Sequence, residues 1–209
     1  ANDQEWLKEN LAIEEDKEAA REKFEELKEE GVLPQNKTVR ILTPLDPRRR
    51  QLGTILATVL KQNGINAEVQ PLDWGPLLEK IYRSESDPDG SDFDMYIIGQ
   101  GVGPDPYYYL HLLFHSEQRV IGAPNNKSWY SNEKVDMLLD RAARTFDQTE
   151  RKWLYVAAQM TIFKDIAHIP LYTYISTQGV RAGVQDYQLI PTGGRIDICG
   201  PYNNVWLKG

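Results

Sequence analysis

The sequence predicts an α/β fold, in which a mostly parallel sheet is flanked by helices. Short apolar runs typical of buried strands recur between residues 39 and 98, and stretches with apolar residues three and four positions apart separate them. Asn63 and Gly64 end the first of these helical stretches. Parallel neighbours need a long connection, which a helix supplies, so this alternation favours a parallel sheet.

The first thirty or so residues precede this alternation and predict a helix. Its apolar residues form two short patches, first Trp6, Leu7 and Leu11, then Ala20, Phe24 and Leu27. Acids and bases mix at helical spacing through residues 14–30, which is typical of a solvated helix face, and Gly31 is suited to end the helix. We therefore divide the chain into a helical lead segment, residues 1–36, and a single α/β lobe, residues 37–209.

The lobe opens with three expected strands that alternate with two helices. The strands are residues 39–43, a run through Ile65, Ala67 and Val69, and residues 95–98. The first helix carries the broad apolar stripe Leu52, Ile55, Leu56, Val59 and Leu60. The second helix carries Trp74, Leu77, Leu78, Ile81 and Tyr82, with Asp73 placed to cap its start.

The second half is expected to be more helical. Ser131 can cap a helix with the stripe Val135, Leu138, Leu139, Ala142 and Ala143. Asp147 and Glu150 have capping-box spacing and open a helix with the stripe Trp153, Val156, Ala157, Met160 and Phe163. Residues 169–174 predict a strand, with a proline near its start, and the loop-rich tail leaves room for a last strand near Trp206.

Composition and charge exclude several classes of protein. The 209 residues include 24 basic and 31 acidic side chains, and the net charge of −7 argues against a nucleic-acid binder, which normally has a basic face. No run of about 18 apolar residues is present, so we expect no membrane span, and the polar start is not a signal peptide. Cys199 is the single cysteine, which excludes an internal disulfide.

A ligand site is expected at the carboxyl ends of the strands, where parallel α/β sheets bind their ligands. Those ends fall at residues 43–47, 72–74 and 99–106. Trp74 could stack on a ligand at this edge or could belong to the core. Tyr107, Tyr108 and Tyr109 cannot all face one cleft, because successive helical residues point in different directions.

Two other chemistries fit the sequence less well. His111 and His115 could ligate a metal on one helix face, but no third ligand stands at motif spacing, so we interpret them as structural and expect no metal or cofactor. Asp46 and Asp105 follow different strands and could pair as the carboxylates of a hydrolase. No Ser–His–Asp or Cys–His signature supports catalysis, and aspartate beside proline is typical of caps and turns, so we expect no enzyme.

A series of motifs follows one order along the chain. It starts near residue 16 with the charged helix and the strand at residues 39–43, and it continues to the end of the chain. Its further members are residues 64–69, Leu72-Asp73-Trp74, residues 93–99, Asp105-Pro106, residues 129–132 with Val135-Asp136, and residues 169–172. This ordered series resembles the family 5 extracellular solute-binding proteins, which are the peptide, nickel and oligosaccharide binders of ABC importers.

This resemblance implies a periplasmic-binding-protein-like lobe, the second of two lobes that enclose a ligand in a larger protein. It implies a small or oligomeric solute as ligand, a membrane ABC permease as partner, no nucleic acid, and a periplasmic or extracellular location. We expect a monomer, and a lipoprotein anchor in a missing N-terminal segment would fit. Solute sensing without import is an open alternative. The implied ligand-binding residues are Asp46, Arg49, Trp74, Gln100, Gly101, Val102, Asp105, Tyr107 and Tyr108.

The loop at residues 99–106 departs from the pattern of the family's peptide binders. Those proteins carry Gly-Trp and then an aspartate that pairs with the peptide's amino terminus, whereas Gln100 stands here in place of the tryptophan and a glycine stands near the aspartate position. An unpaired buried amine is costly, while amides and aromatic rings suit sugar hydroxyls and sugar faces. This departure favours an oligosaccharide over an oligopeptide.

Overall fold

The computed structural model describes residues 16–32, 38–82, 93–99, 105–121, 125–173, 179–187 and 205–208. The chain divides into two compact units. The sheet unit comprises Ala1–Gly99 and Arg119–Lys127, and the helical unit comprises Gln100–Gln118 and Ser128–Gly209. The expected division at residue 36, into a lead segment and one lobe, stays a prediction.

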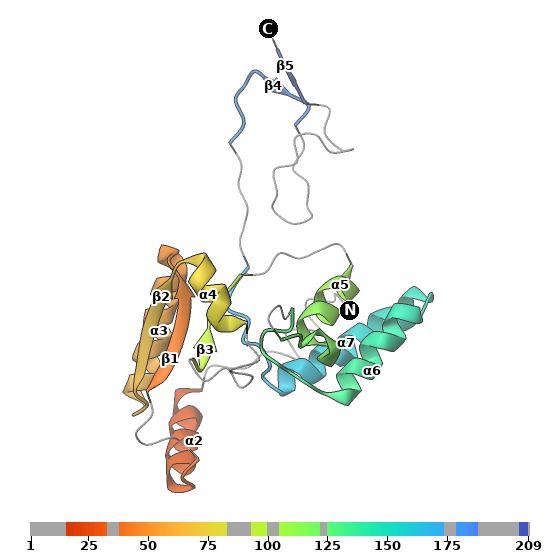
Figure 1. Cartoon of the computed structure of the whole chain (residues 1–209). Helices are drawn as coiled ribbons and strands as arrows, with labels where there is room; N and C mark the ends of the chain where they lie inside the picture. Colours follow the sequence, from red (N-terminus) through yellow and green to blue (C-terminus); the bar gives the residue numbers. More distant parts are fainter. Residues whose placement is uncertain are drawn as a thin grey trace. The chain divides into compact units, whose positions relative to one another are not determined.

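A three-stranded parallel sheet forms the centre of the sheet unit (Figure 1). Strand β1 (Val39–Pro44) lies between β2 (Ala67–Leu72) and β3 (Met95–Tyr96), and both pairings are parallel. The register places Pro44 opposite Leu72, so the carboxyl ends of β1 and β2 are level. The predicted fold class, a mostly parallel sheet flanked by helices, is confirmed.

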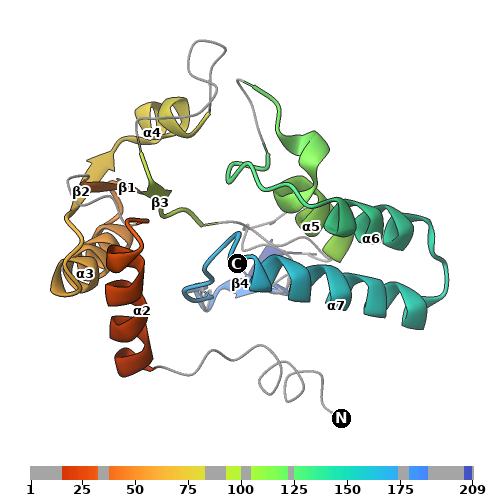
Figure 2. The ribbon, with the colours of Figure 1, turned by 90° about the horizontal axis from the view of Figure 1, so that it is seen from below.

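Helices α3 (Pro47–Gln62) and α4 (Trp74–Ile81) cover opposite faces of this sheet (Figure 2). Alternate residues of β1 point to opposite faces, as the period of a strand requires. Ile41 is buried on the α3 face together with Ala57, and Leu42 is buried on the α4 face with Leu77 and Ile81. The sheet unit is therefore a helix–sheet–helix sandwich.

The apolar stripe of α3 is narrower than the sequence suggests. Leu52, Leu56 and Leu60 pack against the core, whereas Ile55 and Val59 remain 53% and 46% exposed. Gly53 brings the helix close to the sheet: a Cβ at this position would lie 2.9 Å from Thr43 Cγ2 and 3.0 Å from Val69 Cγ1. Because α3 lies this close to β1 and β2, Leu52, Leu56 and Leu60 cover the two strands, and Ile55 and Val59 stay at the surface.

The helix before the sheet, α2 (Lys17–Glu29), is confirmed as a solvated helix. Asp16 caps it, since its side chain accepts the backbone N–H groups of Glu18 and Ala19, and Gly31 ends it at a positive φ of 68°. None of its residues is buried. The expected apolar patch at Trp6, Leu7 and Leu11 lies outside the described residues.

A second stretch of chain, Arg119–Lys127, completes the sheet unit. Within it Asn126 is fully buried, and Lys127 Nζ lies over the Tyr82 ring at 5.7 Å from its centroid. This segment returns to the sheet unit after the chain has formed the first helix of the helical unit.

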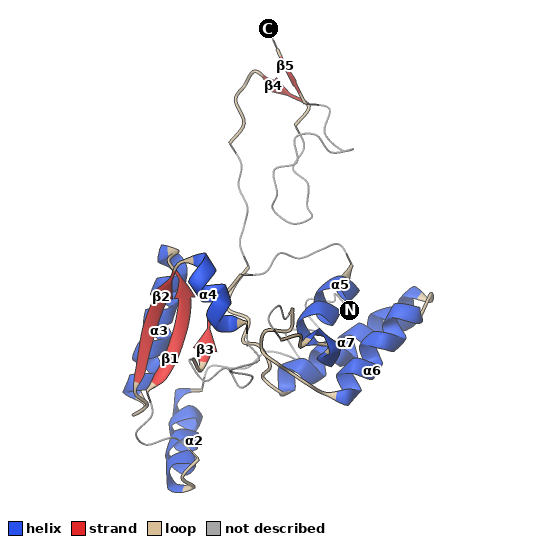
Figure 3. Cartoon of the chain, viewed as in Figure 1, coloured by secondary structure: helices blue, strands red, loops and turns tan. Residues whose placement is uncertain are grey.

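The helical unit is built around α5 (Pro106–Phe114), α6 (Glu133–Arg144) and α7 (Gln148–Lys164) (Figure 3). A 3₁₀ turn, η1 (Ser116–Gln118), follows α5, and the short strands β4 (Val184–Gln185) and β5 (Trp206–Leu207) pair antiparallel. The expected strand near Trp206 is thereby found. The core of the helical unit consists of Leu110, Leu113, Phe114, Val135, Leu139, Ala142, Leu154, Tyr155, Ala158 and Ile162.

Three expectations for this half need correction. Asn132, not Ser131, caps α6, because its side chain accepts the N–H groups of Lys134 and Val135. Helix α7 buries Leu154, Tyr155, Ala158 and Ile162 instead of the predicted stripe, and Trp153 is 52% exposed. Helix α7 carries apolar residues on most of its sides, so the spacing of these residues does not predict which side is buried.

The strand expected at residues 169–174 is the third correction. Residues 169–173 form no strand, and Ile169 and Leu171 are 59% and 54% exposed. An apolar run becomes a strand only where a neighbouring strand supplies hydrogen bonds, and none of the described strands pairs with it. Among the described helices none is both long and apolar enough to cross a membrane.

Candidate functional site

The carboxyl ends of the parallel strands meet at one edge of the sheet unit, as predicted. Pro44 and Leu72 end β1 and β2 side by side, and the Ile97 N–H extends the β3 pairing by donating to the Leu42 carbonyl oxygen at 2.9 Å. Helices α3 and α4 start directly after the first two ends, at Pro47 and Trp74. The ends of all three strands therefore lie at this edge.

Arg49, in the first turn of α3, and Gly99, which follows β3, come together there. A Cβ on Gly99 would lie 2.6 Å from Arg49 Nη2, so the guanidinium group lies against the backbone that follows β3. Asp46 caps α3 by accepting the Arg49 N–H at 3.0 Å, which fixes the first turn of this helix. Within the described part of the chain no carboxylate pairs with the Arg49 guanidinium.

Trp74 lies at the same edge, as the first residue of α4. It is 50% exposed, while Leu77 and Ile81 carry the buried face of this helix. The indole is therefore not a core side chain, and its stacking on a ligand stays a prediction. Asp73 stands at the capping position but makes no side-chain capping bond.

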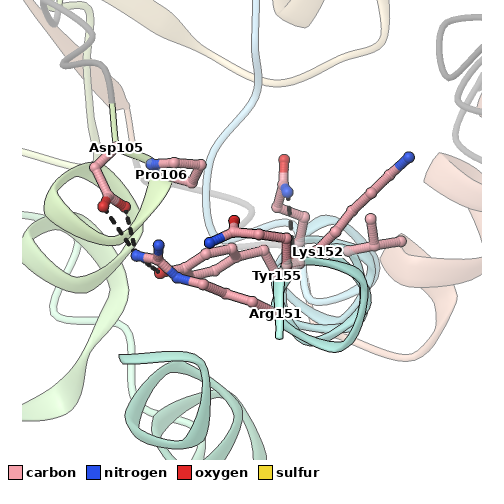
Figure 4. Close-up of a pocket in the computed structure, with 8 residues that line it drawn as sticks. Asp105, Pro106, Arg151, Lys152 and Tyr155 are labelled. Atoms are coloured by element: carbon pink, nitrogen blue, oxygen red, sulfur yellow. Dashed lines mark hydrogen bonds and ion pairs between the residues drawn. The ribbon is translucent and has the colours of Figure 1, made fainter. Parts of the chain in front are cut away.

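Asp105 is engaged within the helical unit. Its carboxylate accepts the Tyr107 N–H at 2.8 Å and thereby caps α5. Arg151 Nη2 lies 3.0 and 2.8 Å from its two oxygens (Figure 4). These two interactions lower the pKa of the Asp105 carboxyl group, the backbone hydrogen bond contributing most. Nothing in the sequence spacing marks Arg151 as its partner, because 46 positions separate the two residues.

An open cavity lies beside this ion pair. It has a volume of about 360 Å³ and is lined by residues of α5 and α7, among them Arg151, Tyr155 and Gln159. Figure 4 shows Arg151 reaching from α7 toward Asp105. Arg151 Nη2 also donates to the Tyr155 hydroxyl at 3.1 Å. The arginine charge beside the cavity is already compensated by Asp105.

The three consecutive tyrosines diverge as expected. Tyr107 packs against the helical core and lies against the His111 ring, with 4.7 Å between ring centroids. Tyr109 also packs on the core, and burial raises its pKa. Tyr108 is 62% exposed. Of the two tyrosines implied as ligand contacts, Tyr108 is mostly exposed and Tyr107 is not, and their contact with a ligand stays a prediction. Gln100, Gly101 and Val102 lie outside the described residues.

One group within the described ranges has the donors of a metal site. His111, His115 and Glu117 each offer one ligand atom, and these atoms lie within 4.8 Å of one another. The spacing of the sequence indicates the histidine pair but does not indicate Glu117 as the third ligand. Glu117 lies in the 3₁₀ turn after α5, outside the helical spacing by which a ligand would be sought.

A parallel sheet with a helix on each face, and a candidate site at the carboxyl ends of its strands, define an α/β fold of the periplasmic-binding-protein class. The chain is similar to the probable D,D-dipeptide-binding periplasmic protein DdpA of Escherichia coli, with 40% identity over 61% of this chain and 23% of the relative. It is also similar to di/tripeptide-binding protein 1 of Pseudomonas aeruginosa, with 29% identity over 72% of this chain and 26% of the relative.

Solved structures agree with these relatives. The ABC transporter-associated periplasmic binding protein DppA of Helicobacter pylori, in complex with the peptide STSA, superposes with a TM-score of 0.63 at 27% identity, over 78% of this chain and 30% of that structure. No protein-family model matches the sequence. The homologues are peptide-binding periplasmic proteins of the family 5 type, so the resemblance that the motifs indicate is confirmed. The chain spans about a quarter of the length of these curated relatives.

Proposed function

We propose that this chain is one lobe of the substrate-binding protein of an ABC importer and that its ligand is a short peptide. The similar proteins are substrate-binding proteins, named for peptides, and are not enzymes. The observation that carries the proposal in this chain is the Arg49 guanidinium, which lies at the carboxyl ends of the strands without a carboxylate partner among the described residues.

Arg49 is suited to the carboxylate end of a peptide. A guanidinium presents parallel N–H donors that match the two oxygens of a carboxylate, and such charge-assisted bonds are about twice as strong as neutral ones. Trp74, half exposed at the same edge, offers a flat apolar face to a peptide side chain. Neutral sugars have no group that requires a guanidinium.

The oligosaccharide favoured by the loop at residues 99–106 is not supported by the relatives. That argument depended on a missing anion for the peptide's amino terminus. The chain spans about a quarter of its relatives' length, so the larger protein offers other residues for this role. Gln100 itself lies outside the described residues, and its proximity to a ligand stays a prediction.

The two carboxylates of the hydrolase alternative, Asp46 and Asp105, both have structural partners. Asp46 caps α3, and Asp105 caps α5 and pairs with Arg151. A carboxylate that serves a cap and an ion pair is a poor general base, because both interactions stabilise its charged form. Import through a membrane permease, with the ligand enclosed between two lobes outside the cytoplasm, is the function we propose for the whole protein.

Calorimetric titration of the full-length protein tests this proposal. We expect di- and tripeptides to bind and oligosaccharides to give no heat. Replacing Arg49 by glutamine should weaken peptide binding by about tenfold to a hundredfold, since a hydrogen bond to a charged group contributes about 1.5–3 kcal/mol. The neighbouring exposed Arg50→Gln serves as the matched control and should bind like the wild type.

Peptides with an amidated carboxyl terminus separate the role of Arg49 from a general loss of charge. Amidation should weaken binding to the wild type and to Arg50→Gln, but should cause little further loss in Arg49→Gln, because the two changes remove the same contact. Binding of sugars together with no measurable binding of peptides would overturn the proposed ligand. Equal losses on amidation in all three proteins would remove Arg49 from the site.

A further inference from the structure

The end of α5 gathers two histidines and a glutamate outside the proposed peptide site. His111 lies in the last turn of α5, His115 is its C-terminal cap, and Glu117 follows in η1. His111 Nε2 and Glu117 Oε1 are 2.9 Å apart. The His111 and His115 side chains are 10% and 8% exposed, whereas that of Glu117 is 59% exposed, so the group opens to solvent on one side.

Helix α6 supports this group with two further carboxylates. Asp136 accepts the Ser116 N–H at 3.0 Å and also the Ser116 hydroxyl, which holds the turn that carries Glu117. Asp140 Oδ1 lies 3.6 Å from His115 Nε2, and Asp136 Oδ1 lies 3.8 Å from His115 Nδ1. Carboxylates placed behind a histidine ligand orient its ring and strengthen its lone pair.

The charge of this surrounding suits a cation. Three carboxylates, those of Glu117, Asp136 and Asp140, face the imidazoles from η1 and α6. Burial, and then the neighbouring His115, lower the pKa of His111, although the three carboxylates oppose this. An imidazole binds a metal in its neutral form, through a nitrogen lone pair.

We propose that His111, His115 and Glu117 bind a divalent transition-metal ion such as Zn²⁺. Two imidazoles and one carboxylate are a donor set that this class of ion prefers, with water completing the coordination. His111 Nε2 and Glu117 Oε1, 2.9 Å apart, can share one ion at about 2.1 Å from each. The site is independent of the peptide site, and either can exist without the other.

The two imidazoles define the movement that binding requires. Their rings stack with 4.5 Å between centroids and 27° between planes, so one ion cannot lie in both ring planes as they stand. His115 Nδ1 accepts the Glu117 N–H at 3.2 Å, and the Nε2 side faces Asp140. One ring, that of His115, must turn about its Cβ–Cγ bond to complete the site. Metal binding thus ends the stacking of the two rings.

Titration of the chelator-treated full-length protein with Zn²⁺ tests the site. We expect one Zn²⁺ per chain, a higher Tm with bound ion, and weaker binding as the pH falls from 7 to 5, because protons compete for the imidazoles. Co²⁺ should give the visible absorption of a nitrogen- and oxygen-ligated ion, and the histidine ring resonances should shift as the stacking ends.

Two matched variants decide the outcome. Glu117→Gln replaces an exposed side chain and should weaken Zn²⁺ binding at least tenfold with an unchanged Tm of the ion-free protein. Glu133→Gln, an equally conservative change of an exposed glutamate at the start of α6, should bind as the wild type. Absence of saturable binding, equal affinity in Glu117→Gln, or an equal response to Mg²⁺ would overturn the proposal. Peptide affinity should be unchanged in both variants.

Discussion

Asp105 combines two interactions that mutagenesis can separate. It caps α5 through the Tyr107 N–H and pairs with Arg151, and its side chain remains 49% exposed. An ion pair this exposed contributes little, about 0–1 kcal/mol, because water and salt screen it. The cap is worth about 1 kcal/mol, since it satisfies an N–H group that otherwise lacks a partner in the helix.

Asp105→Asn and Asp105→Ala should therefore differ. Asparagine still caps the helix, so this variant loses only the ion pair and should be at most about 1 kcal/mol less stable. Alanine loses both interactions and should be about 1 kcal/mol less stable again. Urea unfolding of both variants measures the difference. Equal stability of the two would mean that the cap contributes nothing measurable.

Single residues mark how far the sequence predicts this molecule. The cap at Asp147 is local, and the structure has it, with the Glu150 N–H donating to the Asp147 carboxylate at 2.7 Å. The Glu150 side chain pairs with Arg141, and the reciprocal bond of a capping box is not among the interactions of the described residues. The contact of Arg49 with Gly99 and the pairing of Arg151 with Asp105 join positions far apart along the chain. Local spacing contains no information about such partners, so only the edge of the sheet was predictable, not the chemistry gathered there.

At the scale of elements, existence is easier to predict than orientation. The strand at Val39 and the helices after it were recognisable from their spacing, and both faces of the sheet are covered as expected. The buried face of α7 was not recognisable, since Trp153 and Leu154 are both apolar and only packing against α5 and α6 chooses between them.

A methyl group added at Gly53 should destabilise the protein. Alanine favours a helix by about 1 kcal/mol, but its Cβ would meet Thr43 and Val69, two stiff β-branched side chains. Overpacking costs about 1–3 kcal/mol, so we expect Gly53→Ala to lower the free energy of unfolding by about 1 kcal/mol.

Gly75 provides the matched control in α4. A Cβ there meets nothing within 4 Å, and its φ is not positive, so Gly75→Ala should leave stability unchanged or raise it by about 0.5 kcal/mol. Chemical denaturation of both variants tests the comparison. If Gly53→Ala gained stability as Gly75→Ala does, α3 would not lie as close to the sheet as described.

At the scale of the whole molecule, acid should destabilise the fold in two steps. Hydrogen bonds lower the pKa of two carboxyl groups, at Asp105 mainly from the Tyr107 N–H and at Asp165 mainly from the Tyr130 hydroxyl. Burial lowers the pKa of His111. In each case the folded-state pKa lies below the unfolded-state value, so the unfolded chain binds more protons and stability falls as the pH falls.

The first decline should begin below about pH 6.5, the unfolded pKa of histidine, and the second below about pH 4, that of aspartate. Thermal unfolding from pH 8 to pH 2.5 measures both. Asp105→Asn and Asp165→Asn should flatten the second decline and leave the first in place. A Tm that stayed constant from pH 7 to pH 3 would contradict the described hydrogen bonds of both carboxylates.

The division into two units has a consequence for how the chain is made. Both units are discontinuous, because Arg119–Lys127 completes the sheet unit after α5 and η1 have been formed by the chain. When the ribosome has synthesised residues up to Gly99, the three strands of the parallel sheet are complete. Asn126, which is buried, and Lys127, which contacts Tyr82, have not yet been synthesised. The nascent chain must therefore begin one unit, begin the other, and return to finish the first. Neither unit can be obtained by a single cut in the gene.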